Sequence, residues 1–184
     1  MYCHLKTVKK WIMVAYLTML SMSLYAYARG EPSEDQVKAA FVFNFAKFVE
    51  WPESVLGVTK EIKLCVTGQD KTTEALKLLN QREAQGHALH VAYVGTPDNI
   101  QDFNCHILFI GDSEQKRQQQ WLVKVQNQAV LTISDNVAFI KQGGMISLYT
   151  EANRVQFMIN QSVTQGTGLK ISARMLQLAR VPRE

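Results

Sequence analysis

The chain has 184 residues, and its 47% of apolar residues is enough to build an ordinary hydrophobic core. Its 20 basic and 16 acidic residues give a net charge of +4, but three of the bases lie in residues 1–28, which contain no acid. Residues 29–184 therefore hold 17 bases against 16 acids, a net charge of +1. That balance excludes the basic surface that nucleic-acid binding requires.

The amino-terminal residues have the three parts of a secretory signal peptide. Lys6, Lys9 and Lys10 make a positive start, residues 11–25 carry no charge, and Ala26-Tyr27-Ala28 supplies small residues at a cleavage site. A membrane anchor is the alternative, but a spanning helix needs about 20 apolar residues, and hydroxyl side chains interrupt this shorter run. We expect export to the periplasm, cleavage after Ala28, and a single mature domain over residues 29–184.

Two cysteines remain after that cleavage, because Cys3 lies in the leader. An even pair in an exported protein favours a disulfide over a free thiol or a metal site, so we expect a bond between Cys65 and Cys105. Cys65 lies late in a predicted strand, whereas Cys105 begins one. If the two strands are parallel neighbours, they must be staggered to bring the Cα atoms within about 7 Å.

The first predicted element of the mature chain is an amphipathic helix over residues 34–49. Ser33 and Gln36 match the capping box that begins many helices, and Trp51-Pro52 ends the helical pattern. The aromatic residues 41, 45 and 48 share one face, which we expect to be buried. Val42 and Phe43 are turned away from that face, so we expect them to be exposed and to mark a contact surface.

Strands and helices then alternate along the chain. Apolar, β-branched runs predict strands over 61–67, 89–94, 105–110 and 130–134, with helices over 71–79, 97–103 and 113–126 between them. Residues 145–150 and 154–159 predict an antiparallel hairpin, and a last helix runs from 162 or 168 to 180. The pattern predicts an α/β fold: a three-layer sandwich with a mostly parallel sheet and a C-terminal antiparallel hairpin.

The motifs of catalysis and cofactor binding are absent from the sequence. The turns after the strands lack the glycine spacing of phosphate-binding loops, and no serine lies in a nucleophile elbow. His87 and His90 point to opposite faces of a strand, and His106 reads as a hydrogen-bonded core residue. We therefore expect no enzyme activity, cofactor or metal.

Three residues near the carboxyl ends of the predicted strands are candidates for the rim of a ligand pocket. They are Gly68, Asp112 and Asp135, and open α/β sheets bind ligands at this edge. The alternative for the two aspartates is that each caps the helix that follows its strand.

A set of sequence runs distributed over the whole mature chain is similar to the YfiR family. The runs are KAAFVFNFAKFVEWP (38–52), LCVTG (64–68), CHILFIG (105–111), VLTISD (130–135), GGMISL (143–148), VQFMIN (155–160) and GLKISARMLQLARV (168–181). The resemblance implies a small periplasmic α/β protein, often dimeric, that binds the periplasmic part of an inner-membrane diguanylate cyclase and holds it inactive. The resemblance also implies an outer-membrane lipoprotein that sequesters the repressor, which raises cyclic di-GMP and promotes biofilm.

The resemblance also concerns the cysteines. Cys65 and Cys105 match one cysteine pair of the family, but a second pair in the carboxyl-terminal half is missing here. Redox regulation through that second bridge is therefore not implied. We expect a protein-binding repressor; the alternative is a periplasmic module that senses a small molecule and acts on another partner.

Overall fold

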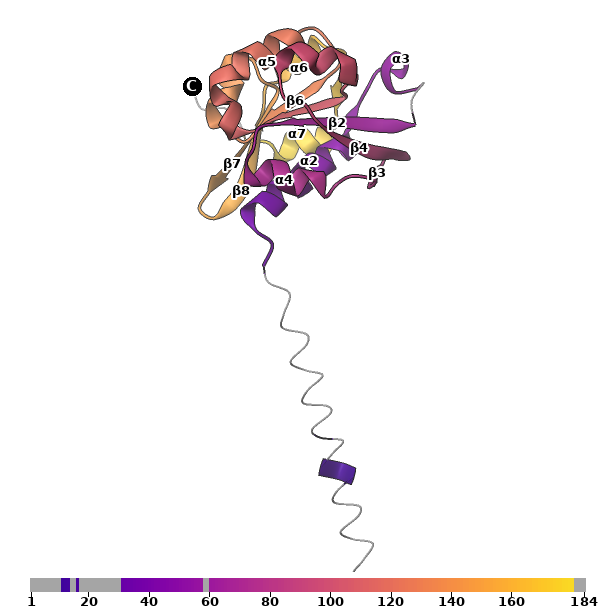
Figure 1. The fold of residues 1–184 in the computed structure, drawn as a ribbon, viewed down its shortest axis with the longest axis vertical. Coiled ribbons are helices and arrows are strands. Elements are labelled where there is room, and N and C mark those ends of the chain that lie inside the picture. The colour runs from indigo at the N-terminus through magenta and orange to yellow at the C-terminus, as the bar shows by residue number, and fades with distance from the viewer. Residues whose placement is uncertain (1–10, 14–15, 17–30, 58–59, 181–184) are drawn as a thin grey trace, which may run out of the picture. The chain divides into compact units, whose positions relative to one another are not determined.

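The computed structural model describes residues 11–13, 16, 31–57 and 60–180, and the described residues from 33 onward form one compact unit (Figure 1). The predicted cleavage site after Ala28 and most of the predicted leader lie outside the described residues. The following description concerns the compact unit alone.

A seven-stranded sheet forms the middle layer of this unit, in the order β3-β4-β2-β5-β6-β7-β8. Strands β4, β2, β5, β6 and β7 are parallel, and the short β3 and the hairpin strand β8 pair antiparallel at the two edges. The predicted α/β class with its carboxyl-terminal hairpin is confirmed. The strands are β2 (Glu61–Thr67), β3 (Glu83–Ala84), β4 (His87–Tyr93), β5 (Ile107–Ile110), β6 (Leu131–Ser134), β7 (Ile146–Glu151) and β8 (Arg154–Ile159).

Helices cover both faces of the sheet (Figure 1). They are α2 (Glu34–Phe48), α3 (Glu53–Leu56), α4 (Lys71–Lys77), α5 (Gln118–Lys124), α6 (Gln161–Gln165) and α7 (Ala173–Leu178), with 3-10 helices η1 (Pro97–Phe103), η2 (Asp112–Arg117) and η3 (Val137–Gln142). Strand side chains alternate between the faces, so Leu64 and Ile107 join the core beneath α2, whereas Cys65 and Leu108 join the core beneath α5. Two hydrophobic cores, one on each face, hold the three layers together.

The capping box of α2 is confirmed, and Phe45 on the predicted face is buried, but Phe48 on that face is exposed and the buried side of the helix also includes Val42 and Phe43. Ser33 and Gln36 bond each other's backbone N–H groups at 3.3 and 3.0 Å. Val42 is 0% exposed and Phe43 is 6% exposed, so the predicted contact surface at these two residues is wrong. The helix is covered from its flank as well as from the sheet: the Arg82 guanidinium lies 4.3 Å from the centre of the Phe43 ring.

The predicted last helix is divided into three elements. The chain forms α6, then β9 (Lys170–Ile171), then α7, and β9 pairs antiparallel with β1 (Val49–Glu50). Gly168 has a φ of +78°, a conformation that stops a helix and that glycine adopts without strain. The two-stranded pairing of β1 with β9 fixes the carboxyl-terminal elements to the end of α2.

Candidate functional site

The carboxyl edge of the parallel strands is the first place where polar side chains gather. From β2 the chain passes to β4 on one side and then returns to β5 on the other, so the sheet changes direction between β2 and β5. Open α/β sheets bind ligands in the crevice at such a switch point. Gly68 follows β2, and Gly111 follows β5, so these two glycines flank the switch point.

The protein's own side chains occupy this crevice. The Ser113 hydroxyl accepts a hydrogen bond from the Gln69 N–H at 2.9 Å, and the Asp70 carboxylate caps α4 by accepting from the Thr73 N–H at 2.9 Å. A Cβ at Gly111 would collide with the Asp70 carboxylate and approach the Thr67 carbonyl oxygen to 2.9 Å. Glycine at this position therefore allows the turns that follow β2 and β5 to approach each other closely.

Asp135, directly after β6, belongs to a buried network of charges that joins α2, α4 and the sheet. Its side chain is 8% exposed, and its Oδ2 lies 3.5 Å from Nζ of Lys38, which also pairs with Glu34 at 2.9 Å. Burial raises the pKa of the Asp135 carboxyl above its ordinary 3.8, the Lys38 ammonium lowers it, and the Asp70 charge raises it again. The rise in pKa shows that burial outweighs the single nearby cation.

The Thr72 hydroxyl connects this carboxyl to a second one. Its Oγ1 lies 2.8 Å from Asp35 Oδ1 and 3.1 Å from Asp135 Oδ2. A hydroxyl has one proton to donate, so Thr72 can donate to only one of the two carboxylates at a time. Protonation of Asp135 supplies the missing hydrogen and completes the chain from Asp135 through Thr72 to Asp35.

The three predicted rim residues do not share one pocket. Gly68 lines an open depression with Tyr93, whereas Asp135 is enclosed between α2 and α4. Asp112 is exposed, and it accepts a hydrogen bond at 3.3 Å from the side-chain amide of Asn136. Asn136 is the residue that follows Asp135 in the chain. Neither aspartate caps the helix after its strand: Asn136 caps η3, with its side chain accepting from the Ala138 N–H at 2.8 Å, and Gly111 is the N-cap of η2.

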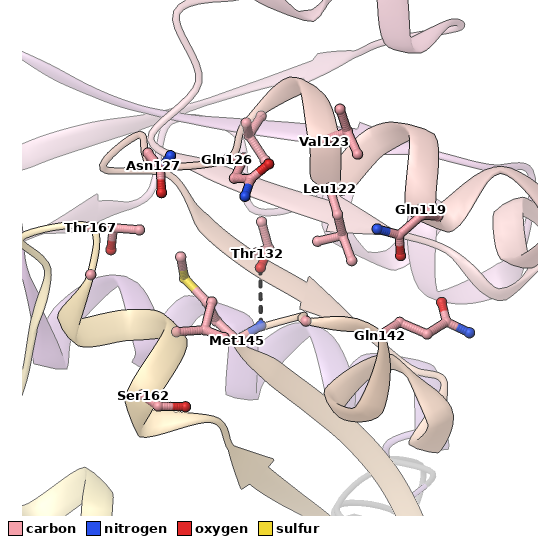
Figure 2. A pocket seen from close by; sticks show the side chains of 14 residues that line it. Gln119, Leu122, Val123, Gln126, Asn127, Thr132, Gln142, Met145, Ser162 and Thr167 are labelled. Atoms are coloured by element: carbon pink, nitrogen blue, oxygen red, sulfur yellow. Dashed lines mark hydrogen bonds between the residues drawn. The ribbon is translucent and has the colours of Figure 1, made fainter.

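A cavity of about 340 Å³ lies on the α5 face of the sheet, between α5 and α6 (Figure 2). Thr132 of β6 and Met145, just before β7, form its floor together with Leu122 of α5. The glutamine and asparagine side chains around its opening are exposed. The sequence analysis missed this cavity, because its walls come from segments that show only ordinary polar surface patterns.

The predicted disulfide is present between β2 and the segment that precedes β5. Cys65 and Cys105 are bonded, with their Cα atoms 5.8 Å apart. The strand register itself does not place the two cysteines opposite each other, because Cys65 is in register with Leu108, and β5 begins at Ile107, two residues later than predicted. Cys105 therefore lies in the segment that leads into the strand, where it can reach back to β2.

His106 is a hydrogen-bonded core residue, as predicted. Its Nδ1 accepts from the Lys63 N–H at 2.9 Å, and its carbonyl oxygen accepts from the Trp51 indole at 3.2 Å. Burial lowers the pKa of the His106 imidazole, a hydrogen bond with the Val55 backbone raises it, and nearby positive charges lower it further. Within the described ranges, no group of three or more His, Cys, Asp or Glu side chains is placed to hold a metal ion.

A model of the YfiR/HmsC-like family matches residues 35–180, which is nearly the whole compact unit. The chain belongs to the YfiR/HmsC-like family. The family assignment confirms the resemblance of the sequence runs. None of the described helices is long and apolar enough to cross a bilayer.

Two solved structures share the fold of this YfiR/HmsC-like chain. A conserved domain protein from Vibrio cholerae is 14% identical with a TM-score of 0.54, over 81% of this chain and 60% of that one. The ABC domain from Streptococcus pneumonia, in complex with L-Trp, is 11% identical with a TM-score of 0.51, over 70% and 58%. The chain thus spans about 60% of the length of these two structures, and the likeness concerns the fold alone.

The buried His106 predicts a pH dependence for this YfiR/HmsC-like domain. Between the lowered pKa of the folded state and the ordinary 6.5, the unfolded chain binds more protons, so the free energy of unfolding falls as the pH falls through that window. We expect His106→Phe to be less stable at pH 7 and to have a smaller pH slope just below 6.5, measured by urea unfolding. His90→Gln, on an exposed residue of β4, is the control, and an equal slope in His106→Phe would contradict the assignment.

Proposed function

We propose that this protein binds the periplasmic part of an inner-membrane diguanylate cyclase and holds the cyclase inactive, which lowers cyclic di-GMP and biofilm formation. The observation that carries the proposal is the family match over residues 35–180. The polar side chains at the sheet edge also favour binding over catalysis. Asp70, Ser113 and Asn136 are all committed to hydrogen bonds within the protein.

Repression across the membrane requires that this domain binds one state of the cyclase better than the other. A shift of about 100-fold in the equilibrium between the two states needs about 2.7 kcal/mol of differential affinity. A modest protein interface supplies that amount, so the mechanism needs no chemical step. An outer-membrane lipoprotein that sequesters the repressor, and a homodimer as the binding unit, complete the proposed regulatory scheme.

Export is part of the same proposal. The predicted leader over residues 1–28 is removed after Ala28, which leaves residues 29–184 as one periplasmic domain. The expected amino terminus of the mature protein is Arg29, and sequencing the protein from a periplasmic extract tests it. An intact Met1 in the membrane fraction would contradict cleavage and favour an anchored form.

The functional test compares two deletion strains. Deleting this gene should raise cyclic di-GMP and surface attachment, and an exported copy should restore both, whereas a copy without residues 1–28 should not. A strain that also lacks the target cyclase should show no rise. An equal rise with and without the cyclase, or no rise in either, would rule out repression of that cyclase.

Sensing of a small molecule is the second candidate function. The cavity between α5 and α6, about 340 Å³, lies at the lower end of the roughly 300–1,000 Å³ typical of ligand sites. One of the two solved structures of similar fold contains L-Trp. If this candidate holds, deleting this gene changes a cellular output other than cyclic di-GMP. That change should be the same in strains with and without the target cyclase.

A further inference from the structure

The lining of the cavity between α5 and α6 is free of charge. Fourteen residues line it, and none of them is Asp, Glu, Lys, Arg or His, although 20% of the chain is charged. A charged ligand would lose its hydration there without gaining a counter-charge, which is costly. The cavity therefore selects an uncharged occupant.

Polar and apolar groups follow one another along the cavity (Figure 2). Gln119 and Gln142 lie at one end, and Asn127 and Thr167 lie at the other. Between the two ends lies an apolar floor, in which Leu122 is 8% exposed and Met145 is 3% exposed. The one hydroxyl of the floor, on Thr132, already accepts a hydrogen bond from the Met145 N–H at 3.1 Å.

The amides around the floor are free to bind. The side chains of Gln119, Gln126, Asn127 and Gln142 line the cavity and make no hydrogen bond with another described residue. Each amide offers both a donor and an acceptor, which is the same pair of groups that a peptide unit offers. A ligand that presents amide, apolar group and amide in this order matches the cavity at both ends and in the middle.

We propose that this cavity binds an uncharged, extended peptide segment, with one apolar side chain on the floor formed by Leu122 and Met145 and with the flanking peptide groups on the side-chain amides. The rim of the cavity leaves room for the backbone of a bound peptide. A Cβ at Gly143 would meet nothing within 4 Å, and one at Gly166 would meet only carbonyl oxygens at 3.5 and 4.0 Å. The proposal holds whether or not a cyclase is the regulated target.

The direct test is a peptide titration of the mature protein, monitored through its backbone amide signals in NMR. The probe is acetyl-Gly-Leu-Gly-amide, and the same peptide with Asp or Lys at its centre is the comparison. We expect saturable shifts confined to α5, α6 and the η3–β7 turn, and binding of the charged peptides weaker by about tenfold or more. Shifts that do not saturate, lie elsewhere, or are equal for all three peptides would overturn the proposal.

Variants on the rim distinguish peptide binding in this cavity from nonspecific binding to the protein surface. Gln119→Ala/Gln126→Ala should weaken the Leu peptide severalfold, whereas Gln115→Ala/Gln120→Ala, which removes exposed amides of η2 and α5 outside the cavity, should not. Ser162→Trp fills the cavity from α6 and should abolish binding, and Gln165→Trp on the same helix is its control. All four variants keep the core intact, so equal thermal unfolding midpoints confirm folding, and unchanged binding in Ser162→Trp would contradict the site.

Discussion

Removal of the disulfide by Cys65→Ser/Cys105→Ser should lower the free energy of unfolding by about 4 kcal/mol. The bond closes a loop with a sequence separation of 40 residues. The chain-entropy model assigns about 4 kcal/mol to a loop of that length, because the bond restricts the unfolded chain. It also joins β2 to the segment before β5 at the centre of the sheet. Urea unfolding of the oxidised protein and of the variant measures the difference.

A second variant separates the bond from the new side chains. Cys65 is 0% exposed, so a serine hydroxyl there is buried and adds its own cost. Cys65→Ala/Cys105→Ala avoids that cost, and the original protein unfolded in reductant reports the bond alone. The alanine variant and the reduced protein should agree within about 1 kcal/mol, and the serine variant should lose more stability than either. Two reactive thiols in the unreduced, denatured protein would show that the bond does not form.

The elements that the sequence predicted well are those with strong local patterns. The bounds of β2 and β8 agree with the predicted 61–67 and 154–159, because alternation and β-branched residues define a strand within its own segment. The capping box at Ser33 is equally local. The parallel direction of the strands also follows from a local rule, since helices between strands require crossover connections.

The errors arose where distant segments decide the outcome. Val42 and Phe43 are buried because α4 and the residues before β3 cover the flank of α2. The helical periodicity of the α2 sequence contains no information about these contacts. The last helix is interrupted because β9 pairs with β1, far earlier in the chain. Pairing between remote segments has no signature in either segment alone.

The candidate sites show the same division. The sequence placed Gly68, Asp112 and Asp135 at the carboxyl edge of the sheet, but the partner of Asp135 is Lys38 on the first helix. Nothing near Asp135 in the sequence points to Lys38 or to Thr72. The sequence also gave no sign of the cavity in Figure 2, because exposed glutamines are common on helices and only the packing of α6 beside α5 makes them a rim.

Loss of the Lys38 charge should destabilise the fold more than loss of any exposed lysine. Lys38 is 11% exposed in its side chain, and its pKa is raised, since the Glu34 and Asp135 carboxylates outweigh the effect of burial. Lys38→Met leaves the buried Asp135 carboxylate without its cation, and breaking a buried pair from one side typically costs about 3–5 kcal/mol. Lys77→Met is the matched control: its partner Glu74 is exposed, so we expect a loss below about 1 kcal/mol.

The pH dependence identifies the cause of that loss. A folded-state pKa raised above 3.8 means that protonation of Asp135 favours the folded state, and that contribution is lost as the pH rises through the raised value. The penalty of Lys38→Met should therefore be largest at pH 7 and should shrink as the pH falls toward 4. Asp135→Asn in the same chain should recover most of the loss at pH 7, because the amide carries no charge and can still accept from Thr72. A loss that is independent of pH, or that Asp135→Asn does not relieve, would mean that Lys38 acts through the packing of its side chain against α2 and the sheet.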